Sequence, residues 1–172
     1  MPGLAERTAT RGLEEGRAVR RFDLRTYTDI SRPASEVFDF VADQTNAPQW
    51  QQGLYEVRRI TPGPIGVGTE HLFVRRFAGM KIESRNRFTE YEPDRFVSFE
   101  IPSGRITGNA SYRVEPTGSN TCRLISEVHF QVSGLGGFAA PLLAKVFERD
   151  TKRDEATLKN LLERNGASAT AN

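Results

Sequence analysis

The sequence contains very few of the side chains that build disulfides, metal centres or nucleophilic sites. It has one cysteine, Cys122, and two histidines, His71 and His129, among 172 residues. A single cysteine cannot form an internal disulfide or a zinc-binding cluster, and the two histidines lack the spacing of metal ligands. No serine elbow or pair of catalytic carboxylates is visible. We therefore expect no metal and no cofactor, and we expect Cys122 to be a small buried residue rather than a nucleophile.

Long apolar runs and a strong excess of one charge are also missing. No apolar stretch approaches the length of a membrane span, and the amino terminus has no apolar signal region. The net charge is only +2, and the arginines are scattered rather than set along one face. The glycine-rich loop at 62–68 lacks the lysine and the helix that follow a phosphate-binding loop. These absences predict a cytoplasmic protein, a monomer or homodimer, with neither nucleic-acid binding nor integral membrane association.

What is present is one ordered segment between two polar ends. Residues 1–20 and 166–172 predict flexible tails, which leaves a single domain at 21–165. Inside it, apolar residues alternate along some segments and recur at helical spacing along others. The predicted strands are 22–31, 54–61, 69–77, 80–91, 95–102, 105–115 and 121–133, and the predicted helices begin at Pro33, cover 46–52 and span 138–165.

This order of elements predicts an α+β fold. Short turns between consecutive strands indicate an antiparallel meander, so the seven strands form one curved sheet. Only the long carboxy-terminal helix is able to cover a face of that sheet, and the two short helices would close one end. Because a single row of helical side chains cannot fill the concave side, we expect an elongated apolar pocket between sheet and helix.

Four stretches of the chain carry a resemblance to a known family. They are residues 30–43 (ISRPASEVFDFVAD) followed by Trp50, 66–69 (GVGT), 88–93 (FTEYEP) and 158–163 (LKNLLE). Together they make residues 22–164 similar to START-like helix-grip proteins, the SRPBCC superfamily of polyketide cyclases/dehydrases and lipid-transport proteins. The resemblance implies a helix-grip fold, a seven-stranded antiparallel sheet wrapped around a long carboxy-terminal helix with two short helices after the first strand. Carriers, receptors and cyclases share this fold, so the fold alone does not predict which of these functions the protein has.

Alternation along the strands predicts which side chains line the pocket. The resulting inner face is mostly apolar, with Ser84, Asn86, Tyr112 and Ser126 as scattered polar groups. That composition suits an aromatic or aliphatic ligand with a few oxygens. The alternative is an ordinary packed core in which the polar groups find partners. The ligand-binding residues that we predict are Trp50, Phe73, Phe77, Ile82, Ser84, Asn86, Phe88, Phe99, Tyr112, Ser126, Phe138, Leu142 and Val146.

The strand at 69–77 has two possible registers. A two-residue turn at Ala78-Gly79 places His71, Phe73, Arg75 and Phe77 on the inner face, with His71 opposite Asn86 and Arg75 opposite Ile82. A longer turn slips the register by one residue and turns Leu72 and Val74 inward instead. The Ala-Gly pair does not decide between them. We favour the first register, which also agrees with the resemblance.

The long helix adds a possible partner for the two inward basic residues. Helical spacing predicts one stripe, which contains Ala139, Leu143, Val146, Asp150, Thr157 and Leu161. A buried carboxylate needs a partner, so Asp150 is predicted to pair with Arg75 or His71. The alternative is a solvated Asp150 beside Arg149 and Arg153. We expect His129 to point outward into solvent.

Three functions are compatible with these features. The first is a carrier or sensor that binds a hydrophobic or aromatic small molecule, lipid- or polyketide-like, in the cavity. The second is a polyketide aromatase/cyclase or dehydratase, with His71, Arg75, Tyr112 and Asp150 as candidate catalytic residues. The third, with least support, is a partner-binding subunit. Polar groups that converge on one point of the pocket favour catalysis, and dispersed polar groups favour carriage.

Overall fold

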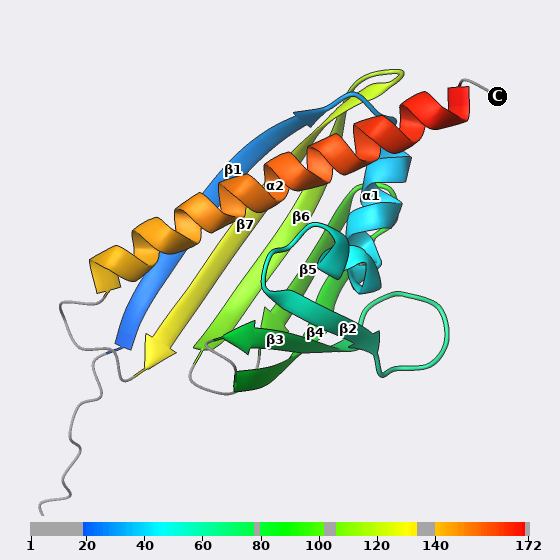
Figure 1. The fold of residues 1–172 in the computed structure, drawn as a ribbon. Helices are drawn as coiled ribbons and strands as arrows, with labels where there is room; N and C mark the ends of the chain where they lie inside the picture. The colour runs from blue at the N-terminus through cyan, green and yellow to red at the C-terminus, as the bar shows by residue number, and fades with distance from the viewer. Residues whose placement is uncertain (1–18, 78–79, 102–105, 134–139, 171–172) are drawn as a thin grey trace, which may run out of the picture.

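The fold has two layers, a curved sheet and a long helix that crosses its concave face (Figure 1). The computed structural model describes residues 19–77, 80–101, 106–133 and 140–170. Within these ranges, seven antiparallel strands lie in the order β1-β7-β6-β5-β4-β3-β2. The strands are β1 (Val19–Ile30), β2 (Leu54–Arg59), β3 (Glu70–Phe77), β4 (Met80–Glu92), β5 (Phe96–Ile101), β6 (Ile106–Gly118) and β7 (Thr121–Ser133), and the helices are α1 (Ala34–Ala42), the 3-10 helix η1 (Gln44–Gln49) and α2 (Ala140–Thr170).

The predicted order of elements is confirmed, and the main differences lie at the ends of elements. The first strand begins at Val19, three residues before the predicted start, and β6 continues to Gly118. The helix α2 continues to Thr170, five residues beyond the predicted end, so the segment predicted as a carboxy-terminal tail is mostly helical. The remaining parts of the predicted tails, residues 1–18 and 171–172, lie outside the described residues.

The register of β3 follows the two-residue turn that we favoured. Phe77 pairs with Met80 across the turn, Arg75 pairs with Ile82, and His71 pairs with Asn86. Successive side chains of a strand point to opposite faces, so His71 and Arg75 share one face of β3. That face is the inner one, because Asn86, the cross-strand neighbour of His71, bonds to Gln44 of η1, and the ring of His71 packs on the core residue Phe88.

A packed core lies at one end of the interior, which we call the closed end. There α1 and the carboxyl half of α2 meet the ends of several strands, and the side chains exclude solvent almost completely. Its central members are Ile30, Phe38, Val114, Leu124, Leu158 and Leu162. Close packing of this kind stabilises the fold through apolar burial, about 25 cal/mol for each Å² removed from water.

Polar contacts fasten the carboxyl half of α2 to the end of β1. The carboxylate of Glu163 accepts a hydrogen bond from the backbone N–H of Ser31 at 2.8 Å. The ammonium of Lys159 donates to the backbone carbonyl of Asp29 and forms an ion pair with Glu163 at 3.3 Å. The closed end is therefore held by both apolar packing and contacts between α2 and β1.

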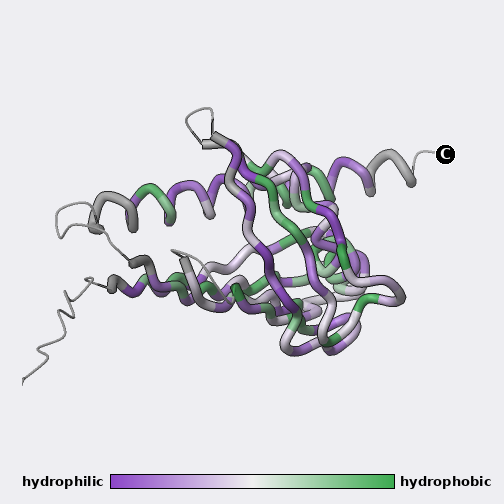
Figure 2. The backbone as a smooth tube through the Cα atoms, turned by 90° about the horizontal axis from the view of Figure 1, so that it is seen from below, coloured by the Kyte–Doolittle hydropathy of each residue, from purple (hydrophilic) through white to green (hydrophobic). Residues whose placement is uncertain are grey.

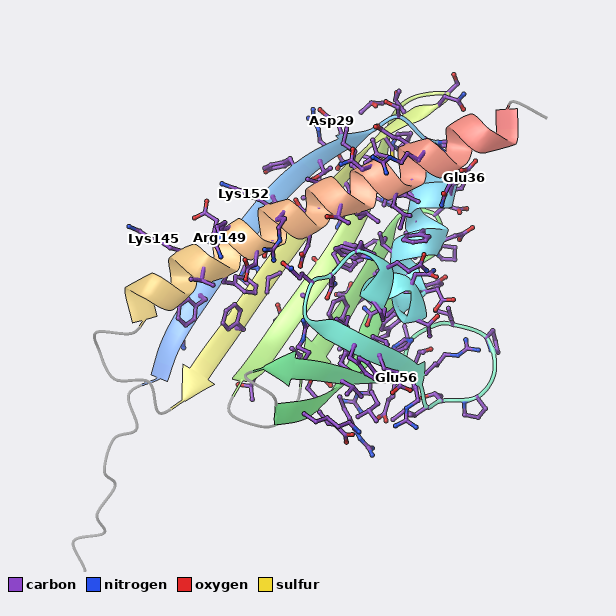
Figure 3. The ribbon with its side chains drawn as sticks, in the orientation of Figure 1. Asp29, Glu36, Glu56, Lys145, Arg149 and Lys152 are labelled. Carbon is purple, nitrogen blue, oxygen red and sulfur yellow. The ribbon has the colours of Figure 1, made fainter. Side chains whose placement is uncertain are left out.

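The buried side of α2 differs from the predicted stripe. Val146 is 38% exposed and Thr157 is exposed, whereas Glu155, Leu158 and Leu162 are buried. Ala139 lies outside the described residues, and only the backbone of Leu143 is described. Figure 3 shows that Lys145, Arg149 and Lys152 follow one another along the amino half of α2, and all three are exposed. The prediction was wrong because it took Val146 and Asp150 as the centre of the stripe, and the helix is rotated toward Leu158.

Apolar and polar residues alternate along the strands below α2, as Figure 2 shows. On β1, for example, Arg21, Asp23 and Arg25 are exposed, and the residues between them are half-buried. This alternation is typical of an antiparallel sheet with one face toward the interior. In the part of the chain that the structure describes, no helix is long and apolar enough to cross a membrane.

Candidate ligand-binding site

Two groups of polar residues lie on the inner face, and they have different surroundings. The first group is His71 on β3, Asn86 on β4 and Gln44 on η1. Asn86 donates a hydrogen bond from its amide nitrogen to the side-chain oxygen of Gln44. The ring of His71 packs on Phe88, with the ring centroids 5.2 Å apart. All four side chains are buried, so this group forms part of the core.

His71 is a neutral buried side chain. It has no exposed surface, and its two ring nitrogens have no hydrogen-bond partner among the described residues. Burial lowers the pKa of His71 below its usual range, and this effect is larger than the opposing attraction of Asp43. A side chain that solvent cannot reach has no direct route for exchanging protons with a ligand, so the geometry does not favour His71 as an acid or base.

The second polar group joins β3, β6 and the segment between η1 and β2 on the inner face. A guanidinium nitrogen of Arg75 on β3 donates to the side-chain oxygen of Gln51 at 3.2 Å. The amide nitrogen of Gln51 donates to the hydroxyl oxygen of Tyr112 on β6 at 3.4 Å. Gln51 lies in the short segment between η1 and β2. Two predicted candidates, Arg75 and Tyr112, are therefore brought together by a residue that the prediction did not include.

Arg75 is reached by solvent and is also surrounded by protein. Its side chain is exposed, yet desolvation by neighbouring groups lowers the pKa of its guanidinium, against the opposing effects of Tyr112 and Asp154. Solvent exposure and a lowered pKa are compatible in a charged group that lies between layers of protein and still contacts water. No carboxylate of the described residues lies within ion-pair distance of Arg75.

Tyr112 stands in a row of aromatic side chains. Its ring centroid lies 6.3 Å from that of Trp50 and 5.8 Å from that of Phe99, and Phe99 lies 6.2 Å from Phe88. Burial, followed by the nearby carboxylate of Glu155, raises the pKa of the Tyr112 phenol well above its usual range. The phenol is therefore protonated at neutral pH, and its O–H remains a hydrogen-bond donor.

The helix α2 contributes two carboxylates to this region. Asp154 accepts a hydrogen bond from the backbone N–H of Gln52 at 3.1 Å, and burial raises the pKa of Asp154 despite that bond. Glu155 is buried and accepts hydrogen bonds from the hydroxyls of Thr26 and Thr28 on β1, the second at 2.9 Å. Both acids lie near Tyr112, whose pKa they raise.

The predicted pair between Asp150 and Arg75 or His71 is wrong. Asp150 instead lies 3.5 Å from Arg149 and 3.3 Å from Arg153, the two neighbours of the alternative, although it is half-buried rather than fully solvated. Asp154, one turn further along α2, is the acid that interacts with Arg75. A stripe centred on Leu158 would have found it, because Asp154 lies four residues before Leu158.

Beyond Tyr112, the inner face is less tightly packed, and we call this part of the interior the open end. The side chains there are partly accessible to solvent, whereas those of the closed end are not. They include stacked rings of Phe22 and Phe130 at 4.8 Å, and an edge-on contact of Phe130 with Phe147 of α2 at 4.7 Å. The apolar side chains of the open end are Phe22, Leu24, Val128, Phe130 and Phe147.

The other predicted lining residues fall into three sets. Trp50, Phe73, Asn86, Phe88, Phe99 and Ser126 are buried, Ser84 and Tyr112 are half-buried, and Val146 is on the exposed side of α2. The hydroxyl of Ser126 and the ring N–H of Trp50 have no hydrogen-bond partner among the described residues. The side chains of Phe77, Ile82 and Leu142, and the whole of Phe138, lie outside the described part of the chain.

The remaining reactive residues have structural surroundings. Cys122 is fully buried, and burial raises the pKa of its thiol to about 11, so it is protonated at neutral pH. His129 points outward, as predicted, and its Nδ1 lies 2.6 Å from a carboxylate oxygen of Asp23. The described residues contain no group of three or more side chains that could hold a metal ion.

Comparison with known proteins agrees with the fold. Residues 21–163 match the family described as polyketide cyclase / dehydrase and lipid transport. The chain belongs to this family. No curated protein matches the sequence, so the more detailed comparisons come from solved structures.

Several solved structures share the helix-grip, START-like fold at low sequence identity. The Zhui aromatase/cyclase from Streptomyces sp. R1128 is 16% identical, with a TM-score of 0.69 over 84% of this chain and 95% of that one. A START superfamily protein from Mycobacterium smegmatis is 11% identical, with a TM-score of 0.69 over 83% and 97%. A protein from Thermus thermophilus is 15% identical, with a TM-score of 0.68 over 80% and 94%. At these identities the likeness establishes the fold alone.

Proposed function

We propose that this protein binds a hydrophobic or aromatic small molecule between the sheet and α2, as a carrier or sensor. The observation that carries the proposal is the meeting of Arg75 and Tyr112 beside a row of aromatic rings on the inner face. Apolar walls with a few convergent polar groups are the usual composition of a small-molecule site. The ligand would place its apolar body against the open end and an oxygen at Arg75.

The charge of Arg75 supports this orientation. Its guanidinium is partly desolvated, and none of the described carboxylates forms an ion pair with it within 4.0 Å. Its hydrogen bond to the neutral side chain of Gln51 does not compensate the charge. A cation in this position binds an anionic or strongly polarised oxygen through short, charge-assisted hydrogen bonds. The lipid- or polyketide-like ligands associated with the family carry such oxygens on apolar bodies.

Native mass spectrometry of the purified full-length chain tests the proposal. We expect a co-purifying small molecule that is lost from Arg75→Gln and reduced in Tyr112→Phe. The matched control is Arg85→Gln, because Arg85 on β4 is an exposed arginine on the opposite face and should leave the ligand in place. Equal retention by wild type, Arg75→Gln and Tyr112→Phe would contradict the assignment of these residues to the site.

A second candidate function is a cyclase or dehydratase reaction in the same place. It is favoured by the convergence of Arg75, Tyr112 and Asp154, because a cation and a protonated phenol together stabilise charge that develops on a carbonyl oxygen. The test is incubation with a poly-β-ketone thioester and detection of water loss by mass spectrometry. Enzymatic function predicts that Tyr112→Phe slows turnover by about 10²-fold at saturating substrate, beyond any loss of binding, whereas a carrier shows no turnover in either protein.

A further inference from the structure

The side chain of Gln51 occupies the place at which Arg75 and Tyr112 converge. Its carbonyl oxygen accepts from Arg75 at 3.2 Å, and its amide nitrogen donates to Tyr112 at 3.4 Å. Both distances lie at or beyond the long end of the normal range for hydrogen bonds in proteins. A carboxamide with one acceptor and one donor therefore already satisfies the two groups to which a ligand would bind, and it does so weakly.

The backbone on both sides of this side chain is held firmly. The N–H of Gln51 donates to the carbonyl of Ala47 at 2.8 Å. The next residue, Gln52, donates from its backbone N–H to Asp154 on α2 at 3.1 Å. The carboxamide can therefore leave Arg75 by rotation about its own side-chain bonds, and neither the backbone nor α2 has to move.

We propose that Gln51 is a specificity-determining residue whose carboxamide is a displaceable internal occupant of the ligand site. This inference rests on the proposed function, because it assumes that a ligand binds beside Arg75 and Tyr112. A neutral carbonyl that replaces Gln51 exchanges one neutral acceptor for another and gains little. A carboxylate adds a second charge and forms an ion pair with Arg75, often through two parallel hydrogen bonds, which a neutral carbonyl cannot match. Gln51 thereby imposes the same displacement cost on every ligand oxygen that reaches Arg75, and an anionic oxygen gains most from Arg75 in return.

The proposal makes a distinctive prediction for three probes with the same apolar body. 2-Naphthoate and 2-naphthamide must both displace Gln51, whereas 2-methylnaphthalene has no group that competes for Arg75. Removal of the carboxamide in Gln51→Ala should therefore tighten both polar probes by the same factor, about tenfold, the low end of the range for a hydrogen bond to a charged group, because the bond is long. The affinity for 2-methylnaphthalene should not change.

Calorimetric titration of the full-length chain with the three probes is the experiment. Gln51→Glu holds a carboxylate beside Arg75, so we expect at least tenfold weaker binding of 2-naphthoate and unchanged binding of 2-methylnaphthalene. The matched control is Gln49→Ala, because Gln49 is exposed and bonds only to Asn46 among the residues described. Circular dichroism and thermal melting of each variant establish that it folds.

The outcomes separate the inference from the proposed function. If the wild type binds the probes and Gln51→Ala binds the polar ones equally or more weakly, Gln51 contacts the ligand or is irrelevant, and the inference is overturned while ligand binding stands. Different factors for 2-naphthoate and 2-naphthamide overturn it as well. If neither the wild type nor Gln51→Ala binds any probe, the proposed function fails and the inference fails with it.

Discussion

The two ends of the interior use the same strands and differ in what α2 places opposite them. At the closed end, Leu158 and Leu162 of α2 belong to the same buried cluster as Val114 of β6 and Leu124 of β7, and α1 adds further apolar side chains. At the open end, α2 presents Phe147, and the apolar residues of the sheet stay partly accessible. A well-packed interior leaves few voids larger than a water molecule. The contrast locates the packed core at one end, and the ligand that we propose would bind at the other.

A row of polar residues separates the two ends. Thr26 on β1, Ser126 on β7 and Tyr112 on β6 are cross-strand neighbours in one line across the sheet. Opposite them, α2 contributes Asp154 and Glu155. Polar groups inside a protein are expensive unless they find partners, and Glu155 finds them in the hydroxyls of Thr26 and Thr28. The row therefore marks the boundary of the packed core.

The largest expected effect is a loss of stability, measured when one apolar residue of α2 is replaced by alanine at each end. Leu158 has no exposed surface, so Leu158→Ala should lower the free energy of unfolding by about 3 kcal/mol through lost burial and a new cavity. Phe147 is only half-buried, and Phe147→Ala should cost about 1 kcal/mol, because little cavity forms where solvent already enters. Urea denaturation measures both. Equal losses would show that the two ends are packed alike.

The row of polar residues provides the next largest effect. Glu155→Ala leaves the hydroxyls of Thr26 and Thr28 without their acceptor, and we expect a loss of about 2 kcal/mol in the free energy of unfolding. Glu155→Gln keeps one acceptor oxygen and should cost less. Glu148→Gln is the control, because Glu148 pairs at 2.6 Å with Lys152 and both side chains are exposed, and such surface ion pairs contribute less than about 1 kcal/mol. If Glu155→Ala leaves the free energy of unfolding unchanged, this carboxylate does not stabilise the boundary between the two ends.

The smallest expected effect concerns pH and the buried His71 near the closed end. Because burial lowers the pKa of His71 in the folded state, the unfolded chain binds more protons below its own pKa of about 6.5, and stability falls as the pH drops through that value. One such group changes the free energy of unfolding by at most about 1.4 kcal/mol per pH unit.

Replacement of His71 by leucine should flatten this dependence, which urea denaturation at several values between about pH 7.5 and about pH 5 would measure. His129→Gln is the control, because His129 is exposed and points outward. The same slope in the wild type and in His71→Leu would show that another group titrates, and that the burial of His71 does not control stability in acid.

Much of the fold and part of the site could be predicted from the sequence. The alternation of apolar and charged residues at 80–91 predicted which face of β4 points inward. A two-residue turn then predicted that His71 and Arg75 of β3 share that face, and the observed register of β3 against β4 confirms it. The rotation of α2 could not be predicted, because several stripes of a long, highly charged helix have similar polarity. The roles of Gln51 and Asp154 were missed for a related reason, since a polar residue in a short connection or on a helix carries no periodic signal.

The sequence by itself determined the order of elements, the antiparallel sheet and the face of β3 that carries His71 and Arg75, because local periodicity and turn length act over only a few residues. Tertiary structure alone decided that His71 is sealed in the core and that Arg75 meets Gln51 and Tyr112. The physical reason is that partners and solvent exposure depend on residues far apart in the chain. Gln51, Arg75 and Tyr112 come together only when the segment between η1 and β2, the strand β3 and the strand β6 have folded around the same interior.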